Sequence, residues 1–121
     1  MIDMNFTEPF WQTLDELVRT SGVVIDRPKG SRHPRYPDYI YPLDYGYLKN
    51  TASMDGGGID VWVGTAEVTE TDAVMVTVDL QKRDVEIKIL LSLTEEEKEL
   101  IFASHNETPN MKGILVRRDK R

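Results

Sequence analysis

Alternation of apolar and polar residues is the clearest pattern along the second half of the chain. In the segments 59–63, 74–79 and 84–91, every second residue is apolar. This period of two puts the apolar side chains of each segment on one face of a β-strand. The pattern therefore predicts three strands here, together with a short strand at 23–25 and a last strand at 112–118.

Two other segments have the pattern of α-helices. Residues 7–20 carry apolar side chains at helical spacing, with Thr7 as the predicted N-cap. A shorter helix is predicted from Thr94, which forms a capping box with Glu97, to about His105. Several short strands with few helices favour an α+β fold, in which a small barrel or curved sheet carries peripheral helices.

The loop at 80–83 determines how two of the predicted strands pair. In this hairpin every apolar residue faces an apolar partner, and Asp79 faces Asp84 with the two Cβ atoms about 5 Å apart. Two such carboxylates repel each other unless they are protonated, separated by solvent or bridged by a cation. The alternative is a solvated hairpin tip with Lys82 and Arg83 as counter-charges.

A second acidic pair, Asp55 and Asp60, flanks three consecutive glycines. Glycines allow the backbone to turn sharply, so an aspartate of the loop and one of the following strand could converge. Carboxylate oxygens are the ligands that Mg²⁺ requires. An ordinary glycine-rich turn is the alternative interpretation.

Composition and charge narrow the class of protein. The chain has 121 residues, 40% of them hydrophobic, which suits one domain with an ordinary core. Without cysteine there is no disulfide framework and no thiolate metal site. No apolar run reaches a membrane span of roughly 20 residues and the N-terminus lacks a signal-peptide pattern, so we expect a cytoplasmic protein with no membrane partner. The net charge of −6 argues against nucleic acid as a partner, and it also suits a protein that holds hard cations.

The segment 28–47 contains four of the six prolines and all five tyrosines. Proline prevents a helix here, and a tyrosine hydroxyl can donate to an anion, although a packing layer explains the rings equally well. Basic residues lie in the segment or just after it: Lys29, Arg32, Arg35 and Lys49. Mg²⁺ on carboxylates, with Lys, Arg and Tyr facing it, is what phosphoryl chemistry needs. The alternative is ordinary surface charge in a loop.

One stretch carries a recognisable motif. Tyr-Pro-Leu-Asp-Tyr-Gly-Tyr at 41–47 is followed, after seven residues, by Asp-Gly-Gly-Gly-Ile-Asp-Val at 55–61. This resembles the soluble family I inorganic pyrophosphatases, in which Tyr-Pro-x-x-Tyr-Gly-Tyr leads into Asp-x-Asp-x-x-Asp. The spacing of Asp79 and Asp84 matches the next acidic pair of the family. Upstream, Val-Ile-Asp-Arg-Pro at 24–28, followed by Arg35-Tyr36, is similar to a strand and a Lys-Tyr pair of the family.

The resemblance implies a fold and a function. The fold is a small, mainly antiparallel β-barrel of the OB-like pyrophosphatase type with peripheral helices, formed by one domain over 1–121. The function is Mg²⁺-dependent hydrolysis of inorganic diphosphate to phosphate, so the partner is a small phosphate substrate. Because the family forms oligomers, a homo-oligomer is expected.

The resemblance also implies a role for individual residues. Asp55, Asp60 and Asp84 correspond to the tightest Mg²⁺ site, Asp79 to a ligand of further ions and Asp26 to an outer carboxylate. Tyr45 corresponds to the tyrosine that contacts phosphate, and Arg35 stands where the family has a phosphate-binding lysine. The residues implied in catalysis are Asp55, Asp60, Tyr45 and Arg35.

Several positions depart from the family pattern. The middle aspartate of the signature, which orients or deprotonates the attacking water, is Gly57 here, and the stretch after Tyr36 is too short for a hairpin that carries a phosphate-binding arginine. A family lysine is replaced by Glu86, with Lys88 on the same face about 7 Å farther along the strand. His105 aligns only loosely with a tyrosine of the family. Two alternative functions follow: a catalytically impaired protein of this fold that binds metal or phosphate, and a hydrolase of another small phosphorylated substrate.

Overall fold

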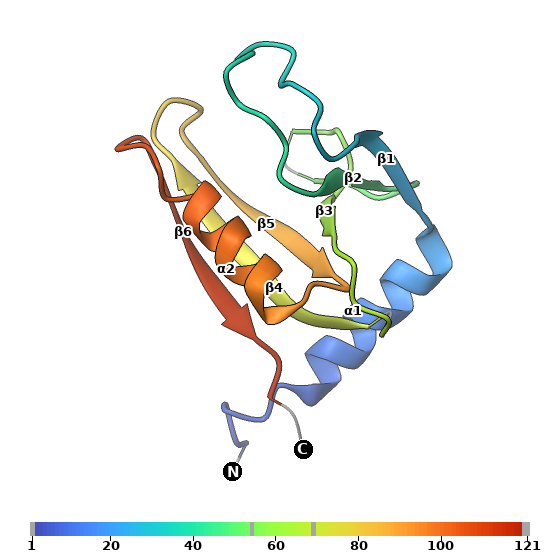
Figure 1. Cartoon of the computed structure of the whole chain (residues 1–121). Helices are drawn as coiled ribbons and strands as arrows, with labels where there is room; N and C mark the ends of the chain where they lie inside the picture. Colours follow the sequence, from blue (N-terminus) through green and yellow to red (C-terminus); the bar gives the residue numbers. More distant parts are fainter. Residues whose placement is uncertain (1, 54, 69, 120–121) are drawn as a thin grey trace.

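The structure is a computed structural model, which describes residues 2–53, 55–68 and 70–119. Its elements follow one another along the chain as shown in Figure 1. In order they are α1 (Glu8–Ser21), β1 (Val23–Arg27), β2 (Asp44–Leu48), β3 (Asp60–Val63), β4 (Thr71–Asp79), β5 (Asp84–Leu91), α2 (Glu95–Ser104) and β6 (Met111–Arg117). Both predicted helices and the five predicted strands are confirmed to within three residues at each end. The strand β2 lies in the proline- and tyrosine-rich segment, where the sequence predicted only extended chain.

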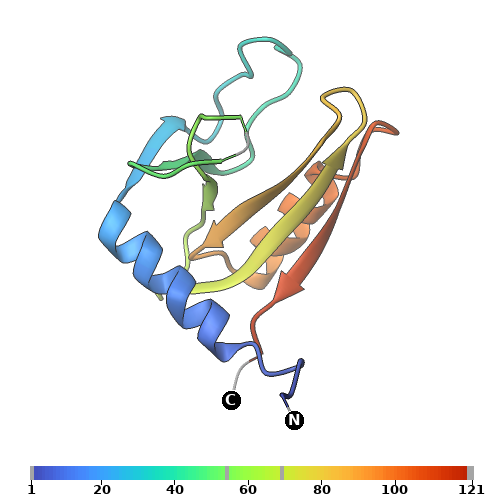
Figure 2. The same cartoon turned by 180° about the vertical axis from the view of Figure 1, so that it is seen from behind.

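The six strands form one sheet in the order β1-β2-β3-β5-β4-β6, in which only β3 and β5 are parallel. The β4–β5 hairpin has the predicted register, with Val78 opposite Val85 and Asp79 opposite Asp84. β1 and β6 are the edges, so the described residues form an open sheet rather than a closed barrel. Figures 1 and 2 show that the sheet is strongly curved, with β1 and β2 turned across the long strands. The predicted α+β class and mainly antiparallel pairing are confirmed.

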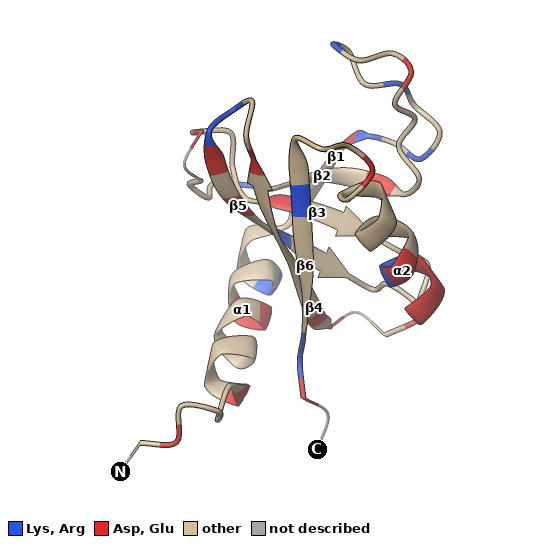
Figure 3. Ribbon diagram, turned by 90° about the vertical axis from the view of Figure 1, so that its left-hand side faces the viewer, with Lys and Arg blue, Asp and Glu red and all other residues tan. Residues whose placement is uncertain are grey.

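The two helices pack on opposite faces of the sheet, as Figure 3 shows. Under α2 lies the larger core cluster, in which Trp62, Met75 and Leu90 are almost fully buried against Ile101. Under α1 lies a second cluster, which consists of Leu48, Val61 and Ile89 with partly buried residues of the helix. The sheet therefore has a covered core on each face, and the strand ends remain available for a site.

The capping predictions had different outcomes. The capping box of α2 is present, since Glu97 N donates to Thr94 Oγ1 over 3.2 Å and Thr94 N donates to Glu97 Oε1 over 2.9 Å. Thr7 occupies the N-cap position of α1 as predicted, but its side chain makes no capping hydrogen bond. Its backbone is already helical (φ −108°, ψ −3°), and its carbonyl oxygen accepts from the amides of Phe10 and Trp11.

Tertiary ion pairs attach α1 to the far end of the chain. Arg118 donates to both carboxylate oxygens of Glu8 and to Asp15 Oδ2, and its side chain is 11% exposed.

Among the described residues, no helix is both long enough and apolar enough to cross a membrane.

Candidate functional site

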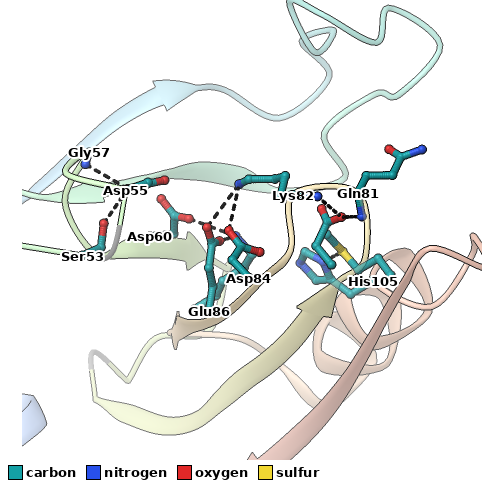
Figure 4. A network of polar contacts seen from close by, with 12 residues as sticks. Ser53, Asp55, Gly57, Asp60, Gln81, Lys82, Asp84, Glu86 and His105 are labelled. Carbon is teal, nitrogen blue, oxygen red and sulfur yellow. Dashed lines mark hydrogen bonds and ion pairs between the residues drawn. The ribbon is translucent and has the colours of Figure 1, made fainter.

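Carboxylates from three segments converge at one end of the sheet, near the tip of the β4–β5 hairpin (Figure 4). Alternation along β3 and β5 places Asp60, Asp84 and Glu86 on the face that α2 covers, because Trp62 and Leu90 of the α2 core share that face. We call this group the acidic cluster; it consists of Asp55, Asp60, Asp84 and Glu86. Asp55, Asp60 and Asp84 were singled out in the sequence as Mg²⁺ ligands, and Glu86 was noted there only as a departure from the family pattern.

A buried lysine lies inside the acidic cluster. The parallel pairing of β3 and β5 sets Trp62 beside Leu90, so Lys88 comes next to Asp60. Lys88 Nζ donates to Tyr45 Oη over 2.8 Å, to Asp60 Oδ2 over 2.9 Å and to Glu86 Oε2 over 3.1 Å. Burial alone would lower the pKa of Lys88, but the oxygens around its ammonium raise this pKa above the ordinary value. Lys88 is therefore a permanent cation.

Tyr45 forms part of the wall behind this lysine. Its ring packs on Trp62 with the ring centroids 4.5 Å apart and on Tyr41 at 5.4 Å, and the Lys88 ammonium lies 5.3 Å from its centre. Burial raises the pKa of the Tyr45 hydroxyl far above its ordinary value, so the hydroxyl stays neutral. The ring of Tyr45 is therefore part of the packing, and its hydroxyl still reaches the acidic cluster. The two roles considered for the tyrosines in the sequence, packing and hydrogen bonding, are thus compatible in this residue.

A second lysine lies on the solvent side of the cluster. Lys82 Nζ is 3.2 Å from Glu86 Oε1 and 3.7 Å from Asp84 Oδ2, and its side chain is 55% exposed. Burial would raise the pKa of Glu86, but Lys88 and Lys82 lower it below the usual range. Asp84 has the opposite shift, because its own burial and the charges of Glu86 and Asp79 raise its pKa. Negative charge is therefore incompletely balanced around Asp84.

Asp55 and Asp79 are both held by local turns. Asp55 Oδ1 accepts from Ser53 Oγ over 2.7 Å and from Gly57 N over 2.9 Å, and these two hydrogen bonds lower the pKa of Asp55. Figure 4 shows its carboxylate on the side of the loop that faces Asp60. Asp79 Oδ1 accepts from the amides at positions 81 and 82, so it organises the hairpin turn. The predicted opposition of Asp79 and Asp84 is present, with Asp79 engaged in the loop.

Two of the predicted site residues lie outside this convergence. Asp26 lies on β1 with its side chain 46% exposed and its nearest ion-pair partner, Arg27, at 3.8 Å. Arg35 is exposed in the loop between β1 and β2, where its backbone amide donates to His33 Nδ1. Within the described part of the chain, neither side chain makes a hydrogen bond or ion pair with the acidic cluster.

His105, at the end of α2, has a more specific environment than the sequence indicated. It is buried, its Nε2 accepts from Trp62 Nε1 over 3.1 Å, and its Nδ1 lies 3.4 Å from Met111 Sδ. Burial and the nearby charge of Lys88 lower the pKa of His105 to about 4. The ring is therefore a neutral acceptor. Nothing in the local sequence pattern indicates this, because the contact joins residues 43 positions apart.

The fit of a metal ion depends on the two lysines. Among residues 2–53, 55–68 and 70–119, no three Asp, Glu or His side chains lie so that they could hold a metal ion together. The acidic cluster carries four negative charges against the two positive charges of Lys82 and Lys88, which leaves two negative charges. One divalent cation would balance these two charges. The charge of the cluster thus leaves room for one divalent cation, whereas the described side chains, in their present positions, do not form a site for it.

Comparison with solved structures identifies the fold. An inorganic pyrophosphatase from Neisseria gonorrhoeae is similar, with a TM-score of 0.56 and 22% identity over 74% of this chain and 77% of that one. The inorganic pyrophosphatase from Thermus thermophilus gives 0.56 and 17% over 79% and 81%, and that from Helicobacter pylori gives 0.53 and 17% over 78% and 81%. No family model matches the sequence, nor does any curated protein. The chain has the fold of these proteins.

Proposed function

We propose that this chain is a Mg²⁺-dependent hydrolase that cleaves inorganic diphosphate to phosphate. The observation that carries the proposal is the convergence of Asp55, Asp60 and Asp84 beside a tyrosine hydroxyl and an exposed lysine (Figure 4). The fold shared with three inorganic pyrophosphatases supports it independently. Metal ligands, a hydroxyl and a solvent-exposed cation are the parts that hydrolysis of a phosphoanhydride needs.

Three carboxylates of the acidic cluster, Asp55, Asp60 and Asp84, are the proposed ligands of the ion. When bound, Mg²⁺ would neutralise phosphate oxygens and lower the pKa of a bound water. Asp79 and Asp26 are our candidates for further ions that accompany the substrate.

The cations and hydroxyl of the chain itself hold the substrate. Lys82 is the cation best placed to bind a phosphate oxygen, because it is exposed and is shared between Asp84 and Glu86. Tyr45 offers its hydroxyl at the inner wall, where Lys88 keeps it oriented. Arg35, in the loop between β1 and β2, is the proposed contact for the second phosphate, which requires that loop to approach the cluster.

A second function is favoured by one observation. At position 57, where the family signature has its middle aspartate, glycine provides no group that could take a proton from the attacking water. A general base typically contributes about 10² to 10⁴ in rate. A protein that binds metal and phosphate without turnover, or that acts on a less highly charged phosphorylated substrate, is therefore the alternative.

The test is release of phosphate from diphosphate in the presence of Mg²⁺. We expect turnover by the unmodified chain, a loss of at least about 100-fold in Asp60→Asn, and no change in Asp38→Asn, an exposed aspartate outside the acidic cluster. Equal turnover by the Asp60→Asn variant and the unmodified chain would exclude the proposed site. A parallel panel of triphosphate and phosphomonoesters separates diphosphate from other substrates. Calorimetric binding of Mg²⁺ or phosphate without any turnover would establish the second function.

A further inference from the structure

The inference concerns Lys88, whose side chain is only 7% exposed although it is charged. Burying a charge is costly unless oxygens around it replace the lost water. Lys88 meets this condition with oxygens from three strands, Tyr45 on β2, Asp60 on β3 and Glu86 on β5. The lysine therefore sits in a preformed oxygen cage.

The number of hydrogen bonds excludes a role in binding phosphate. An ammonium group has three N–H donors and no acceptor. Each donor of Lys88 is directed at a different oxygen, over 2.8, 2.9 and 3.1 Å. No donor of Lys88 is left for a substrate oxygen. Lys82, in contrast, is exposed, and its ammonium pairs with carboxylates while it remains in contact with solvent.

We propose that Lys88 is a built-in cation that takes the place of a metal ion inside the acidic cluster. This rests on the proposed function only in treating the cluster as a metal site. The ammonium holds Asp60 and Glu86 side by side, as an ion bridging them would, and it stays in place when Mg²⁺ binds on the side of Lys82. The cluster is therefore assembled without metal and takes one ion fewer than its carboxylates alone would accept.

The pairing of Lys88 with Glu86 supports this role. The sequence places a glutamate where the family resemblance implies a lysine, which looks like an unfavourable charge reversal. In the structure that glutamate accepts from Lys88 and from Lys82. The charges of Glu86 and Lys88 therefore compensate each other, and both side chains come from the same face of β5.

The first experiment counts bound ions without substrate. Mn²⁺ serves as the probe for Mg²⁺, with bound and free ion separated by electron paramagnetic resonance. We expect Lys88→Met to bind one more Mn²⁺ per chain than the unmodified protein, because its cage then has three free oxygens. The matched control is Lys98→Met, which removes a lysine that is 6% exposed and pairs with Asp72 and Glu95. Its count should equal that of the unmodified protein.

The outcomes of this experiment are distinct. An equal count in Lys88→Met and the unmodified protein overturns the proposal, and so does an equal gain in Lys98→Met. A Lys88→Met chain that folds only when Mn²⁺ is present supports the proposal. Because ions are counted without substrate, the proposal can fail while diphosphate is hydrolysed, and it can hold when hydrolysis is absent.

A second experiment uses the unmodified chain, in case Lys88→Met does not fold. Protein carrying ¹⁵N-labelled lysine gives a slowly exchanging ammonium signal for a buried lysine, which Lys88→Arg identifies by its absence. We expect this signal to persist when Mg²⁺ is added to saturation. Its loss, or a change to the fast exchange of an exposed lysine, would show that the metal displaces Lys88 and would overturn the proposal.

Discussion

Lys88 Nζ lies 2.9 Å from Asp60 Oδ2, and this contact joins β5 to β3 at the one parallel pairing of the sheet. The two partners differ in burial, since the Asp60 side chain is 26% exposed and that of Lys88 is 7% exposed. Removing the carboxylate therefore leaves the more deeply buried charge without a main partner, and this sets the expected cost of a substitution there.

Asp60→Asn is expected to lower the free energy of unfolding by roughly 1 to 3 kcal/mol, because the amide still accepts a hydrogen bond but no longer carries charge. Urea denaturation at pH 7 measures this. Asp84→Asn is the matched control from the same acidic cluster. Burial and neighbouring carboxylates raise the pKa of Asp84, so its neutral replacement should leave stability unchanged or higher. A loss in Asp84→Asn equal to that in Asp60→Asn would contradict this account.

What could be predicted from the sequence was local. The β4–β5 register follows from a four-residue loop and from matching apolar residues on either side, so the opposition of Asp79 and Asp84 was predictable. The place of Lys88 was not, because it depends on the parallel pairing of β3 with β5, and Asp60 is 28 positions away. No local pattern indicates which strands of a sheet become neighbours when they are distant in sequence.

Alternation also could not show which parts of a face are covered. Val74, Val78 and Val85 were all predicted to lie on one apolar face, and they do share it. Val74 is 4% exposed, whereas Val78 and Val85, near the hairpin tip, are 45% and 56% exposed. The difference depends on how far along the strands α1 reaches, which is a property of helix docking and not of strand periodicity.

The buried His105 predicts a pH dependence of stability. The unfolded histidine takes up a proton near pH 6.5, whereas in the fold burial and Lys88 lower the pKa of His105 to about 4. Between these values the unfolded chain binds more protons, so stability falls as the pH decreases from about 6.5 to 4. A pKa that moves from 6.5 to about 4 corresponds to about 3 kcal/mol in total.

His105→Gln isolates this contribution, since glutamine can accept from Trp62 Nε1 but does not titrate. Carboxylates affect both proteins alike. The unmodified protein should therefore lose more stability than the variant as the pH falls from 7 to 4. Urea denaturation at several pH values measures that difference. Curves that stay parallel over the whole range would show that His105 does not carry the effect.

The contact of Arg118 with α1 predicts a third effect on stability. Arg118→Met removes hydrogen bonds to Glu8, Asp15 and the carbonyl oxygen of Thr71, and we expect a loss of roughly 1 to 3 kcal/mol in thermal or urea unfolding. Arg117→Met is the control, because the Arg117–Glu95 pair is 49% and 66% exposed, and such pairs contribute about 0 to 1 kcal/mol. Equal losses in the two variants would mean that burial of the ion pair is unimportant here.

The glycine loop offers a gain-of-function prediction. Gly57 has no left-handed backbone, and among the described residues a Cβ built on it would approach only the Asp55 side chain, with Oδ1 at 3.3 Å. The carboxylate of Asp55 must shift by a few tenths of an ångström, while the amide of residue 57 can still donate to it. An aspartate therefore fits at position 57, beside the acidic cluster, where the family resemblance places the group that activates water.

Gly57→Asp is expected to raise the rate of phosphate release from diphosphate by about 10- to 100-fold, because it supplies a general base to the water. Gly57→Asn is the matched control, since it fills the same space without taking up a proton, and its rate should stay near that of the unmodified chain. If the unmodified chain shows no hydrolysis, Gly57→Asp should give the first measurable turnover. An equal rate in the two variants would indicate that position 57 acts through loop shape and not through proton transfer.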